Sequence, residues 1–259
     1  MQSTDKTSSG AALITGGASG IGAAAAEMLA REGYTVVVTD VDEARGAAVV
    51  ESITKSGAGA AVFMRQDVAS ESDWIRVISD IQEQYGELRV LVNNAAVIGK
   101  LLKLEDLPIE EWRHVTSINL DGTFLGVKHG IRAMKHRGGS IVNISSVAGI
   151  VGAPLQTAYS PSKAGVHVLT KCAALECAHL GYDIRVNSVH PGYIDTPMAS
   201  SVTEIIGGDR FKRRVQRVVP VGRMGEPSDI AEAIVFLAGD RSKYMTGSAM
   251  IVDGGWTAQ

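Results

Sequence analysis

The chain has 259 residues, of which 45% are hydrophobic and 20% charged, and its formal net charge is −3 at pH 7. This size and apolar content suffice for one substantial core, and no Pro/Ser-rich linker or block of charge divides the sequence. The acidic balance argues against a nucleic-acid partner, so we expect a small-molecule one. The polar N-terminus and the lack of a long apolar run argue against a signal peptide or membrane span, and predict a cytoplasmic protein.

Short runs rich in Val, Ile and Leu alternate with helical stretches along the chain. The predicted strands are 11–15, 35–39, 60–65, 90–93, 140–144, 184–189 and 249–252, and the predicted helices are 22–31, 43–56, 71–85, 110–134, 162–179 and 228–237. The strands are nearly continuous in apolar residues, as expected where both faces of a sheet are covered. This pattern predicts an α/β fold, a single Rossmann-type domain over residues 1–259, with about seven parallel strands in a doubly wound sheet and helices on both faces.

The first predicted strand leads into a glycine-rich loop, TGGASGIG at 15–22, which opens onto an alanine-rich helix. Glycines let a backbone approach a pyrophosphate closely, and the positive end of the helix dipole favours its negative charge. A strand, a glycine loop and a helix in this order predict a dinucleotide site formed by Gly16, Ser19, Gly20, Ile21 and Gly22.

Asp40 ends the second predicted strand, in VVVTD, about 20 residues after the loop. A carboxylate there can accept hydrogen bonds from both hydroxyls of the adenosine ribose, and it repels a 2′-phosphate. No Arg or Lys stands at Ala18, Ser19 or Val41 to pair with such a phosphate. NAD is therefore predicted over NADP. The alternative for Asp40 is an ordinary helix cap.

Three later segments carry polar groups of catalytic type: IVNISS at 141–146, YSPSK at 159–163 and SINLDG at 117–122. With the glycine loop and NNAA at 93–96, they resemble the short-chain dehydrogenase/reductase family in order and spacing, from the first strand to the terminal VDGG. RQDVASESDW and GYDIRVNSVHPGYIDTPM are most similar to its bacterial hydroxysteroid and cyclic-alcohol dehydrogenases. The family implies hydride exchange between a nicotinamide ring and an alcohol or ketone carbon.

The resemblance implies that Tyr159 is the general acid/base. A free tyrosine has a pKa of about 10, and Lys163, four residues later, would lower it together with the charge of oxidised nicotinamide. Lys163 is also the expected ribose ligand. Ser146 matches the family serine that donates to the substrate oxygen, with Ser145 as second choice. Asn119 matches a residue at a helix kink that keeps a water beside the lysine. Taken alone, Tyr159 could be a packing group, Ser145 and Ser146 a turn at the strand end, and Asn119 a partner of local backbone. Their joint order favours function.

The resemblance also implies further cofactor contacts. Asp67 is expected by the adenine, Asn93 in the turn at the sheet end, and Ile194 and Thr196 at the nicotinamide carboxamide; the full set is Asp67, Val68, Asn93, Pro191, Gly192, Ile194 and Thr196. A homotetramer paired through helices 110–134 and 162–179 is implied as well. The sequence departs from the family at Ala96, where glycine is usual, and at Pro161, which requires the helix to start close to Tyr159.

The segment 198–221 resembles the family's substrate lid. Its basic cluster, Arg210, Lys212, Arg213, Arg214 and Arg217, is interpreted as a solvated helix face, and no metal-type cysteine spacing occurs, so no metal is expected. The expected pocket wall is apolar: Ile98, Val147, Val151, Leu155, Tyr193 and Met198. A neutral hydrophobic secondary alcohol or ketone is therefore predicted, with a hydroxysteroid first and a simpler alicyclic alcohol or diol next.

Three alternatives are weighed. A 3-oxoacyl-thioester (acyl carrier protein) reductase shares the whole scaffold, but its usual NADPH preference is opposed by Asp40. A catalytically idle dinucleotide-binding redox sensor is opposed by the intact Ser146, Tyr159 and Lys163. A methyltransferase on a similar sheet would not require the Tyr–Lys pair.

Overall fold

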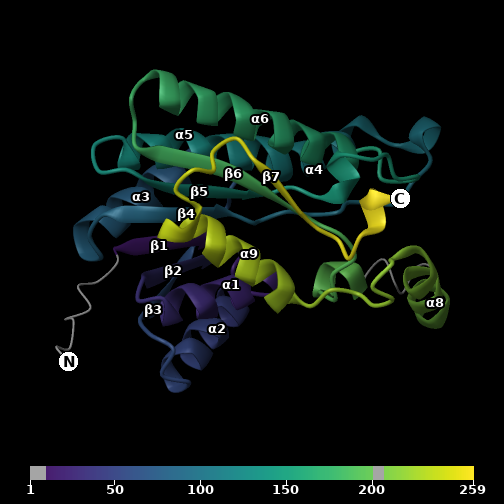
Figure 1. Ribbon diagram of the computed structural model, residues 1–259, viewed down its shortest axis with the longest axis horizontal. Coiled ribbons are helices and arrows are strands. Elements are labelled where there is room, and N and C mark those ends of the chain that lie inside the picture. Colours follow the sequence, from purple (N-terminus) through teal and green to yellow (C-terminus); the bar gives the residue numbers. More distant parts are fainter. Residues whose placement is uncertain (1–9, 201–206) are drawn as a thin grey trace.

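The computed structural model describes residues 10–200 and 207–259. One sheet of seven parallel strands runs through it in the order β3-β2-β1-β4-β5-β6-β7 (Figure 1). The strands are β1 Ala11–Thr15, β2 Thr35–Asp40, β3 Ala61–Arg65, β4 Leu88–Asn93, β5 Gly139–Ile144, β6 Ile184–Pro191 and β7 Ala249–Val252. The chain builds outward from β1 in one direction and from β4 in the other. The crevice for a ligand is therefore expected at the carboxyl ends of these two strands.

Helices cover both faces of the sheet, as predicted (Figure 1). Side chains of β1 alternate between the two cores: Ala12 and Ile14 pack with α1, α2 and α9, whereas Ala11 and Leu13 pack with α3, α5 and α6. Since both faces are buried, the strands need apolar residues at every position. The described helices are α1 Gly20–Arg31, α2 Glu43–Lys55, α3 Glu71–Gln84, α4 Ile109–Thr116, α5 Gly122–Met134, α6 Tyr159–His179, α8 Gly208–Val218 and α9 Pro227–Ala238.

The predicted helix 110–134 is interrupted. One π-helical turn, Ser117–Asp121, separates α4 from α5, and it contains Asn119, where the family resemblance implies a kink. The hydroxyl of Thr123 donates to the Asn119 carbonyl at 2.7 Å across this turn. An inserted residue of this type shifts the helix register locally, which places Asn119 inside the protein.

The other helix boundaries bear on the site. α6 begins at Tyr159, earlier than the predicted 162, and Pro161 lies in its first turn, where its missing N–H costs no helical bond. α8 lies within the expected lid, of which 201–206 falls outside the described residues. None of the described helices is long and apolar enough to cross a membrane.

Candidate active site

A cavity of about 650 Å³ lies along the carboxyl ends of the strands. Its wall draws on the loops after β1, β2 and β3 at one end, and on the loops after β4, β5 and β6 toward the other. It therefore spans the reversal of strand order between β1 and β4, where doubly wound sheets hold their ligands. α6 and α8 complete the wall.

The glycine loop has the close packing that requires glycine. Gly16 and Gly20 both have positive φ, 62° and 52°. A Cβ on Gly16 would lie 2.7 Å from the Cα of Ala95, and one on Gly22 only 2.3 Å from the Gly16 carbonyl oxygen. Gly16, Ser19, Gly20 and Ile21 line the cavity, whereas Gly22 packs behind the loop. The loop therefore presents bare backbone at the start of α1, which suits a pyrophosphate.

The adenosine end is formed by the strand ends of β2 and β3. The Asp40 carboxylate accepts from the backbone N–H of Ala18 at 3.2 Å and of Asp42 at 3.1 Å, and it lines the cavity. The helix cap of α2 is Asp42, not Asp40. Asp40 is thus held against the glycine loop.

Gln66, Asp67 and Val68 follow β3 on the same wall. The Gln66 side chain is buried, and its carboxamide has no hydrogen-bond partner among the described residues. An unpaired buried amide is costly and suits a polar ligand at this end. With the bare glycine loop, these residues fit a dinucleotide, with Asp40 and Asp67 toward the adenosine. Sequence reasoning missed Gln66, which precedes the expected Asp67.

Asn93 is not among the residues that line the cavity, so its expected cofactor contact stays a prediction. It is buried, and its Nδ2 donates to Oδ1 of Asn143 at 2.8 Å, which joins β4 to β5. The next residue, Asn94, lines the wall instead, and its Nδ2 donates to the carbonyl oxygens of Thr15 at 3.0 Å and Gly16 at 2.9 Å. Asn94 thus holds the glycine loop. Asn93, the last residue of β4, thus joins two strands, whereas Asn94, the first residue after β4, lies at the cavity.

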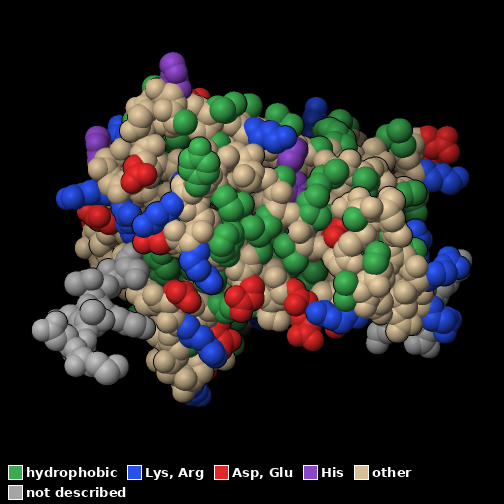
Figure 2. All heavy atoms as spheres, in the orientation of Figure 1, with side chains coloured by type: hydrophobic (Ala, Val, Ile, Leu, Met, Phe, Trp, Pro, Cys, Tyr) green, Lys and Arg blue, Asp and Glu red, His purple; other side chains and the backbone are tan. Residues whose placement is uncertain are grey.

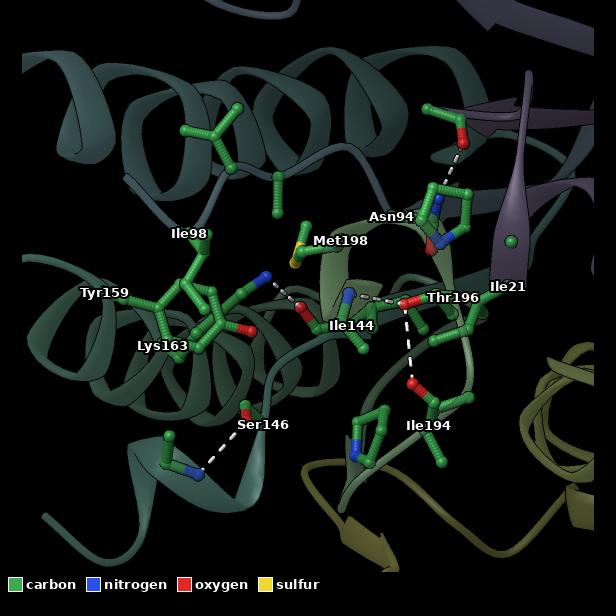
Figure 3. Close-up of a pocket in the computed structure, with 18 of the residues that line it drawn as sticks. Ile21, Asn94, Ile98, Ile144, Ser146, Tyr159, Lys163, Ile194, Thr196 and Met198 are labelled. Carbon is green, nitrogen blue, oxygen red and sulfur yellow. Dashed lines mark hydrogen bonds between the residues drawn. The ribbon is translucent and has the colours of Figure 1, made fainter. Parts of the chain in front are cut away.

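Tyr159, Lys163 and Ser146 meet in the middle of the cavity wall (Figure 3). The Lys163 ammonium donates to the Ile144 carbonyl oxygen at 2.7 Å and lies 5.8 Å from the centroid of the Tyr159 ring. Burial raises the pKa of Tyr159, and the hydrogen bond with Ser146 lowers it. Burial lowers the pKa of Lys163 to about 7. Tyrosinate therefore needs added positive charge nearby, from protonated Lys163 and from an oxidised nicotinamide.

The two serines after β5 differ in environment. Ser145 donates its hydroxyl to the Lys163 carbonyl oxygen at 2.8 Å and so fixes α6. The Ser146 hydroxyl accepts from the Ala148 N–H at 3.1 Å and shares a hydrogen bond with Tyr159. The arrangement favours Ser146 over Ser145 as the group that faces the reacting oxygen.

Asn119 lies outside the cavity wall. Its side chain accepts from the Val97 N–H at 2.8 Å and donates to the Val97 carbonyl at 2.9 Å and to the Ser162 hydroxyl at 3.1 Å. Both amide atoms are therefore engaged in holding the loop after β4 against α6. The role implied by the family, water beside Lys163, stays a prediction.

The segment after β6 closes the nicotinamide end. Pro191, Gly192, Ile194 and Thr196 all line the cavity, as the resemblance implies. The Thr196 hydroxyl approaches the Ile194 carbonyl at 3.5 Å and accepts from the Ala199 N–H at 3.3 Å (Figure 3). A hydroxyl held at a loop turn in this way suits an amide ligand.

The substrate end is largely apolar. Every expected wall residue lines it except Val151, which is exposed elsewhere. Leu155 has a positive φ of 66°, which a leucine rarely adopts and which marks local strain at the rim. Sequence reasoning missed several further lining residues, since nothing local marks them. The wall includes Ile98, Leu101, Val147, Leu155, Gln156, Tyr193, Met198, Phe211, Arg214 and Trp256.

His190 supports the backbone of Ser146. Its Nδ1 lies 3.1 Å from the Ser146 carbonyl oxygen, and its Nε2 lies 2.9 Å from the Ser188 hydroxyl and 3.2 Å from Nδ1 of His167. A carbonyl only accepts, so Nδ1 carries the proton. Burial lowers the pKa of His190 to about 4, which keeps the ring neutral.

We expect His190→Phe to lower kcat roughly fivefold, because one hydrogen bond that fixes Ser146 is lost. His190→Asn, whose amide can still donate, should retain most of the activity. Steady-state kinetics with melting curves would test this, and equal activity in both variants would contradict it.

A glycine-loop cavity with Ser146, Tyr159 and Lys163 at its centre defines a dinucleotide-dependent oxidoreductase. A family model described as enoyl-(acyl carrier protein) reductase matches residues 16–257. The chain is 42% identical to an NADP-dependent (R)-specific alcohol dehydrogenase of Lentilactobacillus kefiri, over 99% of this chain and 100% of the relative. It is 41% identical to trans-4-hydroxycyclohexanecarboxylate dehydrogenase of Sinomonas cyclohexanicum, over 98% and 95%.

Cyclohexanol dehydrogenase of an Acinetobacter species is 37% identical, over 99% of this chain and 98% of the relative. Among solved structures, levodione reductase matches with a TM-score of 0.91 and 33% identity, over 96% of this chain and 97% of that one. An actinorhodin polyketide ketoreductase variant with NADPH matches with a TM-score of 0.91 and 35% identity, over 97% and 98%. The chain belongs to the short-chain dehydrogenase/reductase family, and it is an oxidoreductase.

Proposed function

We propose that this protein is an NAD(H)-dependent dehydrogenase that interconverts a cyclic secondary alcohol and its ketone. The observation that carries the proposal is the cluster of Ser146, Tyr159 and Lys163 in one cavity with the glycine loop and Asp40. The bound nicotinamide supplies or accepts the hydride. Tyr159 exchanges the proton of the substrate oxygen, Ser146 donates to that oxygen, and Lys163 stabilises tyrosinate by its charge.

The choice of NAD rests on the adenosine end. Asp40 faces the cavity there, and the described lining residues contribute no Arg or Lys from β2, β3 or the loops after them. A 2′-phosphate would meet an uncompensated carboxylate. One relative is named NADP-dependent and one similar structure holds NADPH. The preference of this chain between NAD and NADP is therefore tested directly, through Asp40.

Asp40→Asn should shift the cofactor preference toward NADP. Asparagine keeps an oxygen for the Ala18 N–H but removes the charge, so the ratio of kcat/KM for NAD over NADP should fall about tenfold or more. Asp42→Asn is the matched control, because it removes the same charge two residues away and keeps the helix cap. An unchanged ratio in Asp40→Asn would mean that another feature sets the preference.

The substrate class follows from the wall and from the relatives. Mostly apolar side chains line the substrate end, and several relatives are named for cyclopentanol, cyclohexanol or hydroxycyclohexanecarboxylate. These names favour a single-ring alcohol over a hydroxysteroid. The chief alternative is reduction of a 3-oxoacyl thioester. The description of the family model and the similarity to the ketoreductase structure favour this alternative.

The test measures the formation of NADH from NAD, or of NADPH from NADP, with cyclohexanol, cyclopentanol, a hydroxysteroid or a 3-hydroxyacyl thioester as substrate. NAD-linked turnover that is fastest with a single-ring alcohol supports the proposal. Fastest turnover of the thioester with NADP would establish the alternative, and fastest turnover of the steroid would correct the ring size.

We also propose a homotetramer. Large apolar side chains are exposed on the long helices, with Phe124 on α5 and Val168 and Leu175 on α6. A second apolar area includes Tyr244 and Ile251 beside and on β7 (Figure 2). Two such areas suit two interfaces of dihedral symmetry. Light scattering at micromolar concentration should give four times the chain mass, and a monomeric mass would contradict the proposal.

A further inference from the structure

One arginine of α8 borders the substrate end of the cavity. Phe211 and Val215 of this helix are buried and pack in a cluster with Tyr193 and Trp256, so the inner face of α8 closes the cavity. Arg214 lies three residues after Phe211, which places both on one side of the helix. Arg214 lines the cavity and is exposed toward solvent at its rim.

The other charged residues that line the cavity lie away from its apolar substrate end or belong to the central cluster. Asp40 and Asp67 follow β2 and β3 at the adenosine end, and Lys163 lies beside Tyr159. Arg214 is therefore the one charged side chain that the described residues contribute to the apolar substrate end.

Among the side chains that the structure describes, which leave out those of residues 209, 210 and 212, no carboxylate lies within ion-pair distance of Arg214. Arg223, shortly after α8, is by contrast paired with Asp229 at 2.9 Å. A guanidinium is always charged, and apolar walls on one side of it strengthen its attraction for an anion. Its neighbour Arg213 is exposed and lies outside the cavity wall, so Arg214 differs from it in reaching the cavity.

We propose that Arg214 binds a carboxylate carried by the substrate on the side of the ring opposite the reacting carbon. This inference rests on the proposed function and narrows its substrate class to ring hydroxy acids and oxo acids. Tyr159 and Ser146 hold the substrate at its oxygen and Arg214 holds it at its carboxylate, so two polar contacts orient an otherwise apolar ring. The carboxylate is unchanged by the reaction.

The test compares 4-oxocyclohexanecarboxylate with its neutral methyl ester as substrates for NADH-dependent reduction. We expect the wild type to prefer the acid by about tenfold in kcat/KM, as one charge-assisted contact provides. Arg214→Gln should lose this preference, because its KM should rise more for the acid than for the ester. Arg213→Gln, which removes the same charge from an exposed neighbour outside the cavity wall, should keep it.

The outcomes separate the two proposals. Equal or better use of the ester by the wild type would overturn the role of Arg214 while the proposed function stands. A preference for the acid that survives in Arg214→Gln would also overturn this role. So would a KM for NADH that is higher in Arg214→Gln than in the wild type with both substrates, because it would assign Arg214 to the cofactor. If neither compound nor cyclohexanone is reduced, the proposed function itself fails. Loss of the acid preference at high salt would support the ionic contact.

Discussion

Tyr159→Phe should lower kcat by about a thousandfold, because it removes the one hydroxyl that exchanges a proton with the substrate oxygen. Tyr159 lies at the start of α6, shares a hydrogen bond with Ser146 and has Lys163 below its ring. Ser146 cannot replace it, since an alcohol hydroxyl is far less acidic than a phenol and can only donate a hydrogen bond to the substrate oxygen. The aromatic ring stays in the variant, so the packing of α6 is kept.

The measurements are steady-state turnover, NADH binding by fluorescence and a melting curve. Cofactor affinity and stability should stay close to wild type, which would separate lost proton transfer from a lost fold. Tyr193→Phe is the matched control. It removes a phenolic oxygen from the substrate end of the same cavity, where the centroids of the Tyr193 and Phe211 rings lie 5.6 Å apart. This variant should keep most of the turnover. Near-normal turnover by Tyr159→Phe would remove this residue as the acid/base.

The sheet could be predicted from the sequence because burial on both faces gives an unmistakable run of apolar residues. In β1, Ala11 and Leu13 belong to one core and Ala12 and Ile14 to the other, so no position tolerates a charge. The break between α4 and α5 could not be predicted from periodicity, since one π turn leaves the apolar pattern on either side intact. The resemblance to the family placed that kink; the periodicity did not.

Site residues in local motifs were the easiest to predict. The glycine loop and the YSPSK segment carry their geometry in consecutive residues, and the structure brings them to one cavity. The expected contact of Asn93 with the cofactor stays a prediction: Asn93 is paired with Asn143 behind the cavity wall, and the next residue, Asn94, lines the cavity. Arg214 was read as part of a solvated face. Charge pattern cannot tell which side of an amphipathic helix meets a cavity built from distant residues such as Ile98 and Trp256.

Lys163→Met should change activity and stability in opposite directions. Turnover should fall at least a hundredfold, since Tyr159 loses the nearby positive charge that makes tyrosinate accessible. The folded protein, however, no longer has to bury an ammonium group. Lys163 is 2% exposed, and its contact with the Ile144 carbonyl at 2.7 Å compensates only part of that cost.

The pH dependence gives this prediction its sign. The pKa of Lys163 is about 7 in the folded protein, against 10.5 for an ordinary lysine. Between these values the unfolded chain binds one more proton than the folded one, so the free energy of unfolding rises with pH across this window. Below about pH 7, Lys163 is protonated in both the folded and the unfolded state. The cost of burying its ammonium, a few kcal/mol at most, is then constant. Melting temperatures of the cofactor-free wild type should therefore climb by several degrees from about pH 7 to about pH 9. Lys163→Met should lack this climb, and parallel curves for the two proteins would show that Lys163 is already neutral or well solvated in the fold.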